Sequence, residues 1–283
     1  MFWLLILGLP ALSVQAASAP AVEEFSLSSK TFHNTRTVRV LLPPKYHDPA
    51  AATTTYPACY FLDGRAAFDG PGWGLVKTAA ALWAAHRIPE VVFVGVDNGG
   101  STQESTDPMV DRASEFLPWP DPSWTTEPAP TPRGKDHPDF LFNEVVPAVA
   151  SRYRVNADAP ICLAGDSYAA TAALYAAEQR PGRIQALLLE SPPLHFGSLL
   201  TDAQNMTTWP ARVYLGYGTS EGETADTQRE MVIHARRLGN AMSRHAGTAS
   251  KVLEVKGGIH SYDAWRARLK GALTFLLGSD NNP

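Results

Sequence analysis

The chain has 283 residues, of which 45% are hydrophobic and 10% aromatic, and its formal net charge is −4. This length and apolar content are enough for one large domain with a sizeable core. No long basic or acidic run occurs, so the charge pattern does not indicate binding to nucleic acid or to an anionic membrane surface. The two cysteines are too few for a disulfide-rich scaffold.

The N-terminal segment has the pattern of a secretory signal peptide. Residues 1–14 are mostly apolar, and Val14, Gln15 and Ala16 place small residues where a signal peptidase reads the chain. We expect a signal peptide over residues 1–16, a single domain over 17–283 and a secreted or periplasmic protein. The apolar stretch is short for a membrane span. An uncleaved anchor is the alternative, because the basic start typical of a signal peptide is missing.

Short β-rich segments alternate with helical ones, which is typical of a mostly parallel sheet flanked by helices. The predicted fold class is therefore α/β. We expect strands at residues 24–29, 35–42, 57–62, 91–96, 160–164, 184–189, 211–215 and 251–255. We expect helices at residues 74–86, 140–153, 170–179, 230–245 and 262–277.

Residues 97–136 break this alternation. The segment is rich in Pro, Asp, Ser and Thr, it contains Trp119 and Trp124, and it leaves the carboxyl end of a predicted strand. Ligands of open α/β sheets bind at that edge, and long loops inside compact domains are often functional. We expect a long loop that forms a wall or lid over a pocket. A surface excursion without a role is the alternative.

The most informative motif is Gly-Asp-Ser-Tyr-Ala at residues 165–169. It lies between a predicted strand and a predicted helix, with Ser167 at the apex. A serine on such a sharp turn, flanked by small residues, is the nucleophile elbow of α/β-hydrolases. Ala169 stands where the motif has its last glycine. An ordinary turn with a surface serine is the alternative.

A serine nucleophile needs a base, an acid and donors for an oxyanion, with the acid before the histidine in this fold. His260 follows the last predicted strand in a glycine-rich loop, and a histidine exchanges protons near neutral pH. His195 precedes the acid and His234 lies in a predicted helix, so both fit poorly. Glu221 is the preferred acid, because it comes shortly after a strand. The other candidates are Glu223, Asp226 and Glu230.

The expected oxyanion donors are two backbone N–H groups. One belongs to Tyr168, the residue after the nucleophile, and the other comes from the loop after the strand at 57–62. The sharp Asp63-Gly64 turn in that loop would direct the Arg65 N–H into the pocket. A simple turn is the alternative, since Asp-Gly is common turn chemistry.

Cys59 and Cys162 both lie in predicted buried strands. We expect two small buried side chains there. A disulfide between them is the alternative, because these strands would be neighbours in an α/β-hydrolase sheet.

Several segments, in this order, resemble the esterase family that includes enterochelin, feruloyl and acetyl-xylan esterases, S-formylglutathione hydrolases and secreted mycolyltransferases. They are Val-Arg-Val-Leu-Leu-Pro-Pro-Lys-Tyr at 38–46, Tyr-Phe-Leu-Asp-Gly at 60–64, Val-Gly-Val-Asp-Asn-Gly-Gly at 94–100, Arg-Ala-Ser-Glu-Phe-Leu-Pro at 112–118, Phe-Leu-Phe-Asn-Glu-Val-Val-Pro at 140–147, Tyr-Arg-Val at 153–155, and Gly-Ile-His-Ser-Tyr at 258–262 with Trp265. The segments from 94 to 118 look most like the enterochelin-esterase branch. The resemblance covers about residues 35–277.

The resemblance implies an α/β-hydrolase fold, no cofactor, and Ser167 and His260 as nucleophile and base. It also implies that Arg112 and Glu115 line the substrate side, although a surface ion pair is the alternative for both. Trp119 and the other aromatic residues of the long loop indicate an aromatic or sugar-linked acyl group.

We therefore expect a serine esterase that acts on a small-molecule or carbohydrate-linked ester. Two alternatives use the same fold: an acyltransferase with an alcohol acceptor, and a non-catalytic binding protein.

Overall fold

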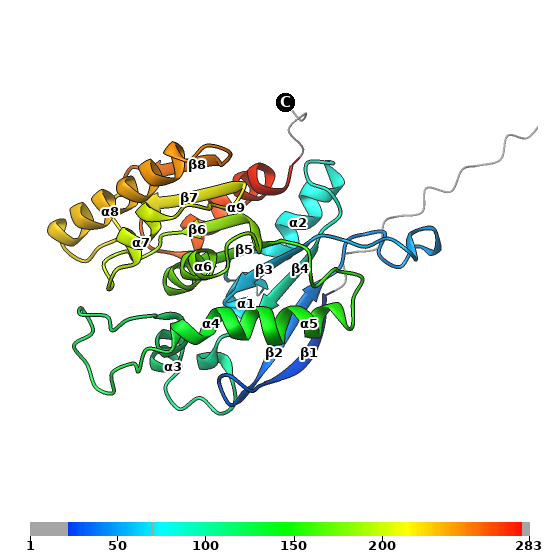
Figure 1. The fold of residues 1–283 in the computed structure, drawn as a ribbon, viewed down its shortest axis with the longest axis horizontal. Coiled ribbons are helices and arrows are strands. Elements are labelled where there is room, and N and C mark those ends of the chain that lie inside the picture. The colour runs from blue at the N-terminus through cyan, green and yellow to red at the C-terminus, as the bar shows by residue number, and fades with distance from the viewer. Residues whose placement is uncertain (1–21, 69–70, 279–283) are drawn as a thin grey trace, which may run out of the picture.

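The computed structural model describes residues 22–68 and 71–278. The predicted signal peptide, residues 1–16, lies outside the described residues. Eight strands form one sheet in the order β1-β2-β4-β3-β5-β6-β7-β8 (Figure 1). β1 and β2 are antiparallel neighbours, β2 is antiparallel to β4, and the pairs from β4 onward are parallel. The predicted fold class, a mostly parallel sheet flanked by helices, is confirmed.

The predicted strands are all present, with ends that differ by a few residues. Their bounds are β1 Val22–Ser29, β2 Asn34–Leu41, β3 Ala58–Leu62, β4 Val92–Val96, β5 Ile161–Asp166, β6 Ile184–Glu190, β7 Arg212–Gly218 and β8 Ala249–Val255. The predicted helices correspond to α2 Leu75–Ala84, α6 Tyr168–Gln179, α8 Ala225–Arg244, α9 Tyr262–Leu277 and a helical segment from α4 His137–Asp139 to α5 Val146–Ala150. Between α4 and α5, residues Phe140–Val145 form a π-helix.

Helices cover both faces of the sheet, and each face has its own core. One core joins alternate strand residues such as Tyr60 and Leu163 to α5, α6 and α8. The other joins the intervening residues, such as Phe61 and Ala164, to α2 and α9. This alternation follows from the period of two along a strand. It leaves the carboxyl ends of the parallel strands as the edge where loops can build a site.

The long segment at 97–136 contains more regular secondary structure than the sequence predicted. It contains α3 Pro108–Phe116 and the 3₁₀ turns Gly99–Ser101 and Gly134–Asp136. The Asp107 side chain accepts a hydrogen bond from the Val110 N–H, and Pro108 is the first residue of α3. Asp followed by Pro is a standard helix start, so the sequence contained a signal for α3 that its Pro-rich surroundings obscured. The short helices α1 Gly64–Phe68 and α7 Leu199–Asn205 were also missed.

Cys59 and Cys162 face each other across β3 and β5. Both are buried and present as free thiols, with the Cys59 Sγ hydrogen-bonded to the Cys162 Sγ. Burial and the neighbouring Cys162 raise the pKa of the Cys59 thiol. The expectation of two small buried side chains agrees with this arrangement.

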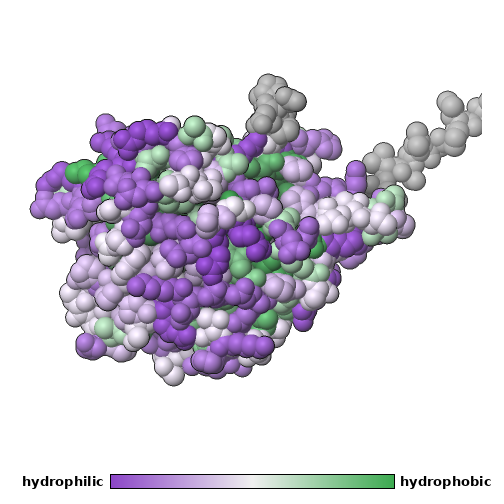
Figure 2. All heavy atoms as spheres, viewed as in Figure 1, coloured by the Kyte–Doolittle hydropathy of each residue, from purple (hydrophilic) through white to green (hydrophobic). Residues whose placement is uncertain are grey.

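The face of the molecule drawn in Figure 2 is largely hydrophilic, and its apolar side chains form small separate areas. Within residues 22–68 and 71–278, no helix has the length and apolar character needed to cross a bilayer.

Candidate active site

Ser167 lies between β5 and α6 at the turn that the sequence motif predicted. Its backbone has φ 51° and ψ −128°, a conformation that non-glycine residues rarely adopt and that is found at strained functional turns. Gly165 is required by this turn, because a Cβ at that position would lie 2.4 Å from the Ala169 carbonyl oxygen. Ala169 itself is fully buried, so the elbow accommodates its methyl group.

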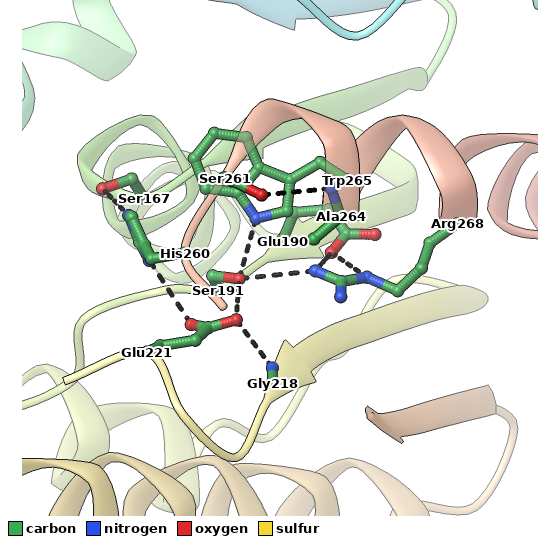
Figure 3. A network of polar contacts seen from close by, with 10 residues as sticks. All are labelled: Ser167, Glu190, Ser191, Gly218, Glu221, His260, Ser261, Ala264, Trp265 and Arg268. Carbon is green, nitrogen blue, oxygen red and sulfur yellow. Dashed lines mark hydrogen bonds and ion pairs between the residues drawn. The ribbon is translucent and has the colours of Figure 1, made fainter. Parts of the chain in front are cut away.

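The imidazole of His260 lies between Ser167 and Glu221 (Figure 3). Its Nε2 is 3.0 Å from the Ser167 Oγ, and its Nδ1 is 3.4 Å from the Glu221 Oε2. The His260 side chain is 32% exposed, whereas that of Glu221 is 1% exposed. The imidazole of His260 is therefore open to solvent and the carboxylate of Glu221 is buried. This is the geometry in which a serine hydroxyl transfers its proton to an imidazole that a carboxylate orients.

Hydrogen bonds of backbone N–H groups connect the loops that carry Glu221 and His260. The N–H of Thr219 donates to the Val255 carbonyl at 3.0 Å, and that of Ser220 donates to the Gly258 carbonyl at 2.9 Å. The N–H of Gly257 donates to the Thr219 hydroxyl at 2.8 Å. Glu221 is the carboxylate that reaches His260. The alternative acids lie farther along the chain, and Asp226 is hydrogen-bonded to Arg229 in the first turn of α8.

The predicted oxyanion donors belong to the first turns of two helices. Tyr168 is the first residue of α6, and Arg65 is the second residue of α1. Backbone N–H groups in a first turn have no partner within their own helix and carry a partial positive charge. Asp63 precedes α1 with φ 61°, and a Cβ on Gly64 would lie 2.4 Å from the Gly95 backbone. The backbone of the turn at 63–64 therefore lies in close contact with the backbone of β4.

Arg112 lies in a buried charged cluster next to the elbow. Its Nε donates to the Asp63 Oδ2 at 2.7 Å, and the Asn98 side chain donates to the other oxygen of Asp63. Asp166, which precedes Ser167, is 1% exposed, and its carboxyl oxygens accept no hydrogen bond from the described residues. Burial, followed by the nearby Asp63, raises the pKa of Asp166 to about 8. At neutral pH this carboxyl group therefore holds a proton.

The other two predicted substrate contacts are packed against the protein itself. Glu115 is 3% exposed and accepts hydrogen bonds from the Arg36 Nη1 and the Gly99 N–H, both at 2.7 Å. Trp119 packs edge-on against Tyr175, with ring centroids 5.6 Å apart. Their roles toward a substrate stay predictions.

Three residues that lie next to the site were assigned no role in it from the sequence: Ser191, Asp121 and Trp265, the last of which was noted only as part of the resemblance. Ser191 and Trp265 are hydrogen-bonded to each other next to Glu221, and Asp121 of the long segment accepts a hydrogen bond from the Tyr168 hydroxyl at 2.7 Å. Ser191 directly follows the carboxyl end of β6, which is the position where polar residues of parallel sheets meet. The position of Ser191 shortly after the predicted strand at 184–189 could therefore have indicated from the sequence that it lies near the site. No group of three or more His, Cys, Asp or Glu side chains suited to a metal ion occurs among residues 22–68 and 71–278.

Residues 29–276 match the model of the family described as "Putative esterase". The chain belongs to this esterase family. The family assignment makes it a carboxylic ester hydrolase and agrees with the Ser–His–Glu arrangement at the elbow. The resemblance noted in the sequence is therefore confirmed. A search of curated proteins gave no match.

Solved structures of the same fold accompany this esterase family assignment. The BES protein from Bacillus cereus has a TM-score of 0.70 at 18% identity, covering 97% of this chain and 100% of that one. The siderophore hydrolase EstB from Aspergillus nidulans has a TM-score of 0.70 at 18% identity, with the same coverage of 97% and 100%. The enterobactin esterase FES from Shigella flexneri has a TM-score of 0.68 at 19% identity, covering 93% of this chain and 60% of that one.

Proposed function

We propose that this esterase is a serine hydrolase that works through an acyl-enzyme, with Ser167 as nucleophile, His260 as base and Glu221 as the orienting acid. The observation that carries the proposal is the 3.0 Å distance between the Ser167 Oγ and the His260 Nε2, with the Glu221 carboxylate on the other ring nitrogen. A nucleophile, a base and an orienting group in hydrogen-bond reach are the signature of covalent catalysis.

The reaction proceeds in two halves. The Ser167 Oγ forms a bond to the ester carbonyl carbon while its proton passes to the His260 Nε2. The tetrahedral intermediate collapses, and the departing alcohol takes the proton from His260. Water then attacks the acylated serine, again giving its proton to His260, and the carboxylic acid leaves as the proton returns to Ser167. The backbone N–H groups of Tyr168 and Arg65 hold the oxyanion in both halves, and removing one such donor costs about 3 kcal/mol in other enzymes.

Arg112 and Trp119 line the substrate side of the site, whereas Glu115 is buried against Arg36 and the Gly99 N–H and contributes to that side only through its neighbours. The ester is a small-molecule or carbohydrate-linked one. Arg112 stands beside the elbow, with its guanidinium 5.7 Å from the centroid of the Tyr168 ring. Siderophore esters belong among the candidate substrates, because a similar structure that this chain covers completely is called a siderophore hydrolase. The protein acts outside the cytoplasm after cleavage of the signal peptide at residues 1–16, a proposal that rests on the N-terminal sequence.

The experiment is an activity-based probe followed by an ester panel. A fluorophosphonate should label the wild type and His47→Ala, an exposed histidine that hydrogen-bonds neither Ser167 nor Glu221, but not Ser167→Ala and only weakly His260→Ala. Labelling of well-folded Ser167→Ala would contradict the proposal. The panel contains p-nitrophenyl acetate, butyrate and octanoate, methyl ferulate, acetylated xylan and a catecholate siderophore. Adding an alcohol acceptor and analysing the products distinguishes hydrolysis from acyl transfer.

A further inference from the structure

Ser191 is a buried serine beside the acid, at the end of β6. It is 1% exposed, and its Oγ lies 2.7 Å from the Glu221 Oε1 (Figure 3). Its backbone has φ 50°, which is uncommon for a non-glycine residue, and its N–H donates to the Gly216 carbonyl at 2.7 Å. Strained residues of this kind persist where the surroundings hold them firmly, and they cluster at functional sites.

Two neighbours determine where the Ser191 hydroxyl proton points. The indole Nε1 of Trp265 donates to the Ser191 Oγ at 2.9 Å, and the Arg268 Nη2 approaches it at 3.5 Å. Tryptophan and arginine side chains can only donate, and a hydroxyl has a single proton to give. The Ser191 proton therefore goes to the Glu221 Oε1.

This hydrogen bond holds one oxygen of Glu221 and leaves the other for His260. The Oε1 accepts from the Gly218 N–H at 2.6 Å as well as from Ser191. The Oε2 faces the His260 Nδ1 at 3.4 Å, a long contact whose strength depends on how the carboxylate is turned. Anchoring Oε1 from two sides keeps Oε2 directed at the imidazole.

Trp265 contributes to the base as well as to the acid. Its ring stands edge-on to the His260 ring, with centroids 5.0 Å apart and planes at 86°. Trp265 is 4% exposed, and its side chain packs in the core between the sheet and α9. Its position relative to Glu221 and His260 is therefore fixed by this packing.

We propose that Ser191 is a positioning residue for the reaction, and that it transmits the fixed orientation of Trp265 to the Glu221 carboxylate. The proposal rests on the proposed function of Ser167, His260 and Glu221. Ser191 touches no reacting atom, so its contribution passes through the acid and concerns the chemical steps rather than substrate binding.

The test uses Ser191→Ala and, because that variant keeps the strained backbone, also Ser191→Gly, which adopts positive φ freely. Both remove the hydroxyl. We expect kcat for p-nitrophenyl acetate to fall about tenfold or more while KM changes less than about twofold. Trp265→Phe keeps an aromatic ring beside His260 but removes the N–H, and we expect a smaller loss of kcat. Ser29→Ala and Trp83→Phe are the matched controls, since both residues are buried and contact neither Glu221 nor His260.

The deciding comparison repeats Ser191→Ala in the Glu221→Ala background. If Ser191 acts through Glu221, adding Ser191→Ala to the Glu221→Ala variant lowers kcat by less than about twofold. Equal losses in both backgrounds, or a folded Ser191→Gly with wild-type kcat, overturn the inference while leaving the proposed function standing. A wild-type protein without Ser167-dependent hydrolysis overturns both.

Discussion

The backbones of Gly218 and Gly258 are in direct contact. A Cβ added to Gly218 would lie 2.2 Å from the Gly258 carbonyl oxygen, and one added to Gly258 would lie 3.0 Å from the Gly218 Cα. Gly218 is the last residue of β7, three residues before Glu221, and Gly258 is two residues before His260. The loops that carry Glu221 and His260 can therefore approach this closely because neither glycine has a side chain.

The first prediction follows from this contact. Gly218→Ala must push the acid loop away from the histidine loop, because no flexible side chain is there to yield. A displacement of about 1 Å can cost about 100-fold in rate, so we expect a loss of kcat/KM of that order. Gly271→Ala is the control, since a Cβ at that position of α9 meets nothing within 4 Å. Wild-type kinetics of Gly218→Ala would contradict the prediction.

The second prediction distinguishes the four candidate acids. Glu221→Gln keeps the shape of the side chain but removes the charge that stabilises the imidazolium, so we expect kcat/KM to fall by a factor of about 10² to 10⁴. Glu223→Gln, Asp226→Asn and Glu230→Gln should each retain activity within about twofold. The measurement is steady-state hydrolysis of p-nitrophenyl acetate. A larger loss in one of the three controls would reassign the acid.

The third prediction concerns pH and Asp166. The unfolded carboxyl has a pKa of about 3.9, whereas burial, followed by Asp63, raises the pKa of folded Asp166 to about 8. Between these values the folded state keeps a proton that the unfolded state has lost. The contribution of the protonated Asp166 to the free energy of unfolding is therefore fully present below about pH 4. It is lost as the pH rises toward 8, by at most about 1.4 kcal/mol per pH unit.

Asp166→Asn carries a neutral amide at every pH and should escape this loss. We expect its advantage in free energy of unfolding over the wild type to grow between about pH 4 and 8 and then to stay constant. Urea unfolding at several pH values measures it, with the exposed Asp158→Asn as control. Parallel curves for wild type and Asp166→Asn would rule out the protonated carboxyl.

The fourth prediction separates structure from substrate binding at Arg112. Arg112→Met leaves Asp63, which is 2% exposed, without its cation, and we expect the free energy of unfolding to fall by about 3–5 kcal/mol. Adding Asp63→Asn removes the uncompensated charge and should restore part of that stability. If Arg112 also holds the substrate, the stable double variant keeps a raised KM. A wild-type KM of the double variant would show that Arg112 stabilises the protein by pairing with Asp63 and does not bind the substrate.

Features carried by neighbouring residues could be predicted from the sequence. α9 begins and ends at the predicted residues, and Ser167 and His260 could be proposed as nucleophile and base because an elbow and a glycine-rich loop are local patterns. The helix α3 was missed although its start signal, Asp107-Pro108, is also local, because its surroundings were read as a loop.

The chain order of strand, serine, helix, acid and histidine, together with the apolar periodicity, determined the fold class and the candidates for nucleophile and base, Ser167 and His260. Only the tertiary structure decided that Glu221 reaches His260, that Ser191 is hydrogen-bonded to Glu221 and to Trp265, and that Arg112 pairs with Asp63. Each of these contacts joins segments 30 or more residues apart in the chain. Their geometry depends on how loops at one sheet edge pack together, and no local pattern contains that information.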